Sequence, residues 1–264
     1  MSFGAAGVVG TSFGLAKRNF FKVLGLYLLG GIVAILVSGV FGAASFSGFQ
    51  GGPGNMGSMT ATLFVGQILA QIPLLAAGLA AIALLASDAR GERISFTAAA
   101  KLGLRKTPIS IVVSLLLGLI FAVALVPVIG IVGAMGPESP AIVLVMLALF
   151  PFLLWLNAAL LPVFPALVAE DRGISAIKRG FSLSNGYRLS IIGSLLLLCL
   201  AIFAVVIVFG LGMGLVVGGA MQAPSAADGA MIVSMIVYGV MALFMAILGI
   251  AFQAAVYARL VECE

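Results

Sequence analysis

The sequence contains no histidine, and this absence removes the commonest general base, proton shuttle and metal ligand of proteins. Its only two cysteines, Cys199 and Cys263, lie far apart and form no CxxC motif, so neither a disulfide framework nor a thiolate metal site is expected. No Ser–Lys, Cys–His or paired-carboxylate arrangement and no phosphate-binding loop is present. We therefore expect no catalytic residue, no metal site, no cofactor and no enzymatic activity.

Charge is also scarce, and its scarcity indicates the class of protein. Charged residues make up 8% of the chain and apolar residues 63%, whereas soluble domains have about 25% and about 45–50%. A soluble fold of 264 residues could not bury this much apolar surface, so the surrounding solvent is expected to be lipid. No stretch is polar enough to form a soluble domain, so residues 1–264 are predicted to be a single transmembrane domain.

Six apolar runs are long enough to cross a bilayer as helices, which takes about 20 residues each. Uninterrupted runs of this length indicate helices rather than barrel strands, because the backbone of a helix satisfies its own hydrogen bonds in lipid. The sequence therefore predicts an all-α polytopic membrane protein with six transmembrane helices. These lie at about 23–44, 61–87, 108–133, 140–168, 189–218 and 230–257.

The basic residues predict the orientation. All thirteen Lys and Arg residues lie before the first predicted helix, between the second and third, between the fourth and fifth, or after the sixth. The other three connections contain only Glu138 and Asp228 as charges. Because basic segments stay on the cytoplasmic side of a membrane, we expect both termini in the cytoplasm and the chain in a bacterial inner membrane.

An internal repeat is indicated by a cation at the entry of each odd-numbered predicted helix, which recurs every 83 residues at Lys22, Arg105 and Arg188. The flanks match as well, since residues 19–22 (NFFK) share Asn, aromatic and cation with residues 185–188 (NGYR). We interpret the chain as three pseudo-repeated hairpins, each preceded by a short interfacial amphipathic helix. The units would span about 3–91, 92–173 and 174–264.

The segment before the fifth predicted helix has the most distinct amphipathic pattern. Ile174, Ile177 and Phe181 share one helical face, and basic residues lie away from it. Such a helix lies in the headgroup plane of a bilayer. Six cations are therefore candidates for binding anionic headgroups: Lys22, Arg105, Arg172, Lys178, Arg179 and Arg188. The alternative is that these cations only set topology; nucleic acid is not expected, because lipid is the nearer anion.

Residues 176–188, which read AIKRGFSLSNGYR, resemble the signature found just before a transmembrane helix in the membrane domain of glycerophosphoryl diester phosphodiesterase and its stand-alone bacterial relatives. Gly180-Phe181 stands where a Ser-aromatic pair is usual, and the entry to the first predicted helix, residues 18–22, also resembles this group. The resemblance implies a polytopic membrane protein. The soluble phosphodiesterase domain and its acidic and histidine catalytic residues are missing, so that activity does not carry over.

Few polar side chains fall inside the apolar runs. They are the amides Gln67, Gln71, Asn157 and Gln253. Such amides either hydrogen-bond between helices, worth about 0.6–2 kcal/mol, or line a polar path. The acidic residues Asp88, Glu92, Glu170 and Asp171 each have a cation within two residues, so local ion pairs are expected.

Glycine and proline predict two features of the helix bundle. Gly210, Gly214 and Gly218 form a GxxxGxxxG ridge, which lets another helix approach closely, either within the chain or from a second copy. Pro162 and Pro165 are expected to kink the fourth predicted helix near its cytoplasmic end, because proline removes backbone hydrogen bonds.

Together these patterns predict a non-enzymatic integral inner-membrane protein, a scaffold or accessory whose basic cytoplasmic face engages anionic lipid headgroups. A transporter or lipid-handling protein with a path between the hairpins is the alternative. The expected partners are membrane lipids, with a membrane-protein partner or a second copy of the chain also open.

The charge distribution makes a direct prediction about topology. Reporter fusions at residues 50, 136 and 225 should give signals from outside the cytoplasm, whereas fusions after residues 91 and 173 should give cytoplasmic signals. A cytoplasmic signal from any of the first three sites would contradict the six-helix topology.

Overall fold

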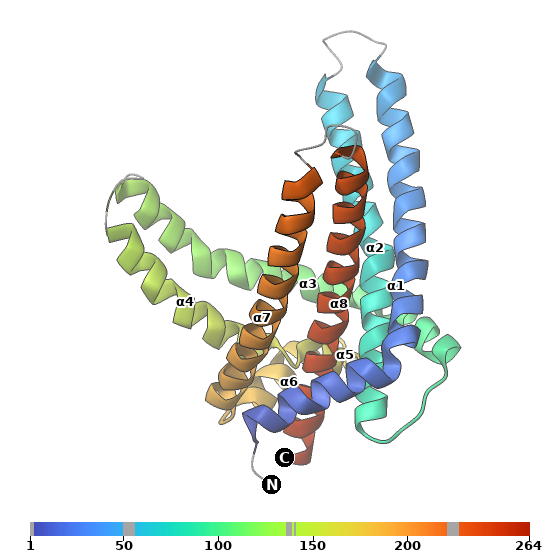
Figure 1. Cartoon of the computed structure of the whole chain (residues 1–264). Helices are drawn as coiled ribbons and strands as arrows, with labels where there is room; N and C mark the ends of the chain where they lie inside the picture. Colours follow the sequence, from blue (N-terminus) through green and yellow to red (C-terminus); the bar gives the residue numbers. More distant parts are fainter. Residues whose placement is uncertain (1–2, 50–55, 136–138, 140, 221–226) are drawn as a thin grey trace.

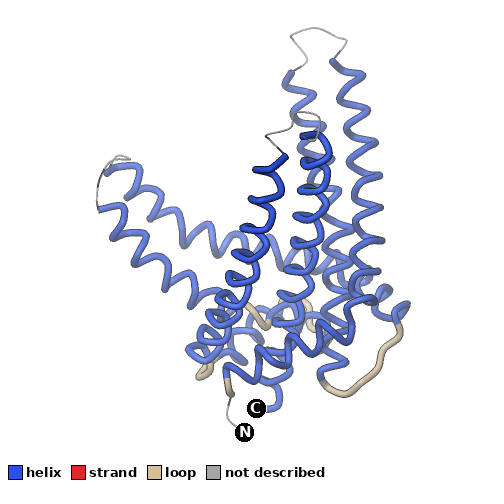
Figure 2. The backbone as a smooth tube through the Cα atoms, viewed as in Figure 1, coloured by secondary structure: helices blue, strands red, loops and turns tan. Residues whose placement is uncertain are grey.

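The computed structural model describes residues 3–49, 56–135, 139, 141–220 and 227–264, and the described residues form helices and loops without a strand (Figures 1 and 2). The helices are α1 (Ala5–Phe49), α2 (Met56–Ala89), α3 (Phe96–Met135), α4 (Ala141–Leu160), α5 (Val163–Ala169), α6 (Ser175–Ser184), α7 (Arg188–Ala220) and α8 (Ala227–Glu262). Among these residues, six helices are long and apolar enough to cross a membrane, which confirms the predicted class and helix number.

Both chain termini lie at the same end of the bundle, which we call the basal end (Figure 1). The connection from α2 to α3 and the short helices α5 and α6 lie at this end too (Figures 1 and 2). Because the long helices run alternately away from and back to the basal end, each segment that holds the basic residues is found there. The structure thus brings the cations of distant segments to one end of the molecule.

The segments that precede the three hairpins differ from the prediction in form. α1 and α3 are 45 and 40 residues long, so the first two segments continue directly into the long helices. Figure 1 shows the first part of α1 lying across the base before the helix turns along the bundle. Only the third segment forms a separate helix, α6, because Gly186 adopts φ +85° and ends it before α7. The three-unit repeat and the interfacial role of these segments stay predictions.

The fourth predicted helix is interrupted at the first of the two prolines that were expected to kink it. α4 ends at Leu160, and α5 begins at Val163 after Pro162, which has no backbone N–H to continue the helix. Pro165 is tolerated because it lies in the first turn of α5. Glu170 caps the carboxyl end of α5.

The packed core lies toward the basal end, where α2 is the most buried of the six long helices. Its residues 79–87 are all buried, together with Phe252 and Tyr257 of α8. Away from the base, the helices expose many large apolar side chains, and the α3–α4 hairpin diverges from the other helices (Figure 1). In a bilayer, lipid would cover these exposed surfaces.

Glycine and alanine bring α2 close to both of its neighbours. A Cβ atom at Gly30 of α1 would lie 2.9 Å from the Cβ of Ala77, and one at Gly103 of α3 would lie 2.5 Å from the carbonyl oxygen of Ala76. Contacts of this kind hold membrane helices together, since lipid is as apolar as the helix surfaces. Glycine is required at position 103 because backbone, which cannot move aside, occupies the space.

The predicted glycine ridge of α7 is described only in part. A Cβ atom at Gly210 would meet no atom within 4 Å. The surroundings of Gly214 and Gly218 lie outside the described side chains, so a contact through the ridge stays a prediction.

The close approach at Gly103 can be tested against a second glycine of the same helix. Replacing Gly103 with Ala should destabilise the protein by about 1–3 kcal/mol, because the new methyl group overlaps the backbone of α2. Gly118 has no neighbour within 4 Å, so Gly118→Ala should be neutral or slightly stabilising. Thermal melts of both variants in the same detergent measure the difference; equal melting temperatures would show that α2 and α3 do not pack in this way.

Candidate functional site

Asp88, near the end of α2, is bound by side chains from the first part of α1. The Arg18 guanidinium forms an ion pair with the carboxylate and also donates from Nε at 2.9 Å. The Asn19 amide donates to the same carboxylate oxygen at 2.7 Å. Three donor groups on two consecutive residues therefore fix the first part of α1 against the end of α2.

Asp171 pairs with Lys106, which lies 65 positions earlier on α3. The Lys106 side chain is only 9% exposed, whereas that of Asp171 is 69% exposed. The hydrogen bond from the ammonium group lowers the pKa of the Asp171 carboxyl. This pair connects the basal part of α3 to the turn between α5 and α6, where Asp171 has a positive φ of 51°.

Glu170 is the most connected of the basal acids. Its carboxylate accepts hydrogen bonds from Arg179 Nε at 3.1 Å and from the Tyr257 hydroxyl at 3.0 Å, and it pairs with Arg172 at 2.7 Å. Arg179 also binds Glu264 at 2.5 Å. The bond to Glu264 and the bond to Glu170 raise the pKa of Arg179, and the bond from Arg179 lowers that of Glu264. The cluster joins α5, α6 and the end of α8.

Arg188, the first residue of α7, lies against aromatic rings. Its guanidinium carbon is 4.3 Å from the ring centre of Trp155 on α4 and 5.8 Å from that of Phe181 on α6, in the range of cation–π contacts. Its Nε is buried and has no hydrogen-bond partner among the described residues. The side chain thus connects α7 to α4 and α6.

The expectation of local ion pairs is correct for some acids and wrong for others. Glu92 pairs with Arg90 and Glu170 with Arg172, both close in sequence. Asp88 and Asp171 instead pair with Arg18 and Lys106, 70 and 65 residues away. Packing of α1 against α2, and of α3 against α5, brings these distant cations closer than the local ones.

Positive charge remains in excess at the basal end after these pairs are formed. Asp88, Glu92, Glu170, Asp171, Glu262 and Glu264 are all engaged by cations. Seven other cations form no ion pair with any residue that the structure describes. Arg188 is one of them and lies against aromatic rings, and the remaining six are exposed. They are Lys17, Lys22, Arg93, Lys101, Arg105 and Lys178.

The six predicted headgroup residues are therefore of two kinds. Arg172, Arg179 and Arg188 are engaged by neighbouring side chains of the protein. Lys22, Arg105 and Lys178 are exposed and unpaired within the described chain, so their ammonium and guanidinium groups are accessible to an anion.

Two cavities lie along α1, α2 and the start of α3. A polar one of about 170 Å³ at the basal end is lined by Arg18, Asn19, Lys22, Leu84, Asp88, Glu92, Arg93 and Ile94. An apolar groove of about 560 Å³ is lined by Leu26, Leu29, Gly30, Val33, Ile72, Pro73, Ala76, Ala77, Ala80, Ala100, Leu104, Thr107, Pro108 and Ile111. A third, of about 330 Å³, lies between α7 and α8.

The four intramembrane amides are not brought together around any of these three cavities. Gln67, Gln71 and Asn157 are exposed on their helices, and Gln253 is half-buried in α8. No cluster of three or more His, Cys, Asp or Glu side chains within the described residues could hold a metal ion. A polar path lined by the amides stays a prediction.

Comparison with known proteins gives no match: neither a family model, nor a curated protein, nor a solved structure matches this chain. The resemblance of residues 176–188 to the glycerophosphoryl diester phosphodiesterase membrane domain therefore stays a prediction.

Sequence patterns do not single out several of the basal residues that the structure brings together. Lys106 directly follows Arg105, one of the predicted headgroup residues, and Asn19 is distinguished in the sequence only by its place in a repeated motif. Tyr257 and Trp155 lie within apolar runs, so their contacts with Glu170 and Arg188 depend on how α8 and α4 pack. A hydrogen-bond partner for Tyr257 could have been predicted, since a buried tyrosine hydroxyl generally needs one.

The Glu170 cluster can be tested by removing its central charge. Glu170→Gln should destabilise the protein by about 1–3 kcal/mol, because it removes the charge that pairs with Arg179 and leaves one acceptor oxygen for both Arg179 and Tyr257, in a site that is 18% exposed. Glu262→Gln serves as a control, since its pair with Arg259 is exposed and such pairs contribute about 0–1 kcal/mol. Thermal melts in detergent compare the two variants; a Glu170→Gln protein as stable as Glu262→Gln would show that the cluster does not hold the helices together.

Proposed function

We propose that this protein is a non-enzymatic integral membrane protein, a scaffold or accessory, that binds anionic lipid headgroups with its basal face. The observation that carries the proposal is the excess of positive charge on this face. Every basal acid is engaged, and six exposed cations are unpaired within the described chain. An anionic membrane surface is the counterion nearest to these cations.

The positions of three cations support the proposal most directly. Lys22 and Arg105 are exposed just before the apolar parts of α1 and α3 begin, and Lys178 is exposed on α6. Long basic side chains at such places reach the phosphate level of a bilayer. Each contributes roughly 1 kcal/mol near an anionic surface, an attraction that falls off within about 8–10 Å at physiological salt.

Orientation is part of the same proposal. The inner leaflet of a bacterial membrane faces the cytoplasm, and basic residues accumulate on that side. We therefore place the basal face, with both termini, against the cytoplasmic leaflet of the inner membrane. The resemblance to a phosphodiesterase membrane domain without its catalytic domain favours the same class of protein.

Two charge-matched triple variants test the proposal. The first replaces Lys22, Arg105 and Lys178 with Gln, and the second replaces Arg90, Arg172 and Arg259 with Gln. Each removes three positive charges, but the second removes cations that are paired with acids two or three residues away. The first variant should retain about 100-fold less phosphatidylglycerol or cardiolipin at equal lipid concentration, as expected for three cations at roughly 1 kcal/mol each.

Lipid retained by the two variants and the unmutated protein is measured by native mass spectrometry after purification in a mild detergent. The second variant should retain lipid nearly as the unmutated protein does. If both triple variants retain the same amount of anionic lipid as the unmutated protein, the unpaired cations only set topology and the proposal is wrong.

A further inference from the structure

We infer that the surface formed by α1, α2 and the start of α3 holds one anionic diacyl phospholipid, with its phosphate at Lys22 and Arg93 and an acyl chain in the apolar groove. This inference rests on the proposed function and goes further, because it names a single site and a ligand with chains. Its structural basis is the polar cavity and the apolar groove on this surface, which adjoin each other.

The groove has the chemistry of a chain-binding site. Its floor is made of small buried residues, Ala76, Ala77 and Ala80, which are at most 6% exposed. Its rim is made of large exposed apolar side chains, including Leu29 and Leu104. Small residues between larger ones leave a recess in the protein surface, and an acyl chain is the apolar molecule that surrounds a membrane helix.

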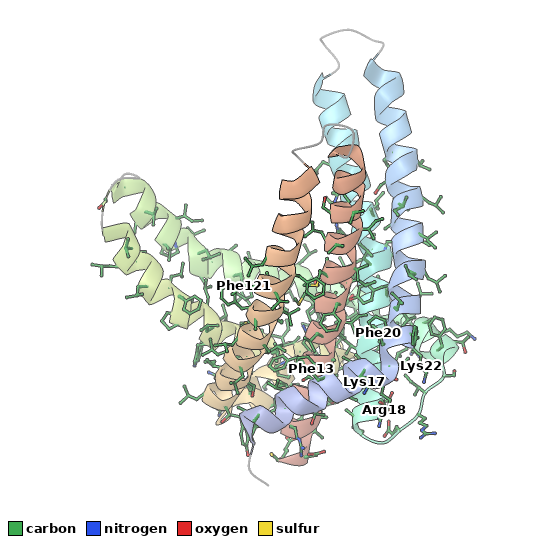
Figure 3. All side chains as sticks on the ribbon, viewed as in Figure 1. Phe13, Lys17, Arg18, Phe20, Lys22 and Phe121 are labelled. Carbon is green, nitrogen blue, oxygen red and sulfur yellow. The ribbon has the colours of Figure 1, made fainter. Side chains whose placement is uncertain are left out.

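The polar cavity has a net positive charge available to a ligand. Both of its acids are already engaged, Asp88 by Arg18 and Glu92 by Arg90. Lys22 and Arg93 line the same cavity and are exposed, and neither forms an ion pair within the described chain. Figure 3 shows Arg18 and Lys22 on the basal part of α1, near the connection from α2 to α3. A phosphate group there would meet two unpaired cations.

The polar cavity and the groove follow one another along two helices. On α1, Lys22 lines the cavity and Leu26 lines the groove, four residues further from the base. On α2, which runs the opposite way, Leu84 lines the cavity and Ala80 the groove, again four residues apart. Residues four apart lie above one another on the same face of a helix, so the groove begins where the polar cavity ends.

The depth of the groove agrees with one leaflet of a bilayer. Its lining residues span 26–33 on α1, 72–80 on α2 and 100–111 on α3. At 1.5 Å per residue the α1 and α2 segments are roughly 10–12 Å long, and one leaflet of the hydrocarbon core is roughly 15 Å thick. The α3 segment is inclined to these two helices, so its greater length does not measure depth (Figure 1). A phospholipid with its phosphate at Lys22 would therefore extend its chains along the groove for most of the leaflet.

The first experiment measures binding of phosphatidylglycerol to the full-length protein in detergent by native mass spectrometry. The double variant Lys22→Gln/Arg93→Gln should bind about 30-fold more weakly, from about fivefold per cation. Lys17→Gln is the control on the same helix, since Lys17 is exposed but lines neither cavity, and it should change the affinity by less than about threefold. Glycerol phosphate, which has the headgroup charge but no chain, should compete weakly.

The second experiment blocks the groove. Ala100→Trp should weaken binding at least about tenfold, because it displaces several chain methylenes worth about 0.8 kcal/mol each. Ala98→Trp is the control on the same helix, at an exposed alanine outside the groove. Unchanged binding by Ala100→Trp in a folded protein, shown by its thermal melt, would overturn the assignment of the groove.

A third measurement needs no variant. A phosphatidylglycerol with a photoreactive group in its acyl chain should label residues of 26–33, 72–80 and 100–111 in the unmutated protein. Labels spread evenly over all exposed apolar surfaces, or a second copy of the chain cross-linked at this surface, would overturn the inference. If those results coincide with lipid loss in the Lys22, Arg105 and Lys178 triple variant, the proposed function stands and only this site is wrong.

Discussion

Close contact between backbones is the constraint on which the rest of this structure depends. Lipid offers apolar side chains as good an environment as another helix does, so apolar burial alone cannot hold helices together in a bilayer. α2 meets α1 at Gly30 and α3 at Gly103, where small residues let the helices approach within van der Waals contact. These contacts place the ends of α1, α2 and α3 side by side, and the charged groups at the base are positioned as a consequence.

The basal ion pairs make this packing specific for one arrangement of the helices. Asp88 binds side chains of the first part of α1, Asp171 binds a side chain of α3, and Glu170 binds side chains of α6 and α8. Partly desolvated pairs of this kind contribute less net stability than their geometry suggests, but an unpaired partner is costly. Their arrangement therefore disfavours alternative packings of very similar apolar helices, which would leave a carboxylate without its cation.

The sequence was sufficient for the number of long helices, the break at Pro162 and the gathering of cations at one end. Those features follow from local properties: the length of apolar runs, the missing N–H of proline, and the alternation of helix direction. The partners of Asp88 and Asp171 could not be predicted in the same way, because they depend on which helices pack together. The glycines show the same limit, since the regular spacing at Gly210 predicts a helix contact while the isolated Gly103 is the one that lies directly against the backbone of α2.

The divergence of the α3–α4 hairpin has a mechanical consequence. α3 is 40 residues long and strongly inclined to α1 and α2 in Figure 1, and its outer part is largely exposed. A helix longer than the hydrocarbon thickness adapts by changing its tilt. A thinner bilayer would flatten the hairpin and a thicker one would raise it, so the area that the protein occupies in the plane of the membrane depends on the thickness of the surrounding lipid.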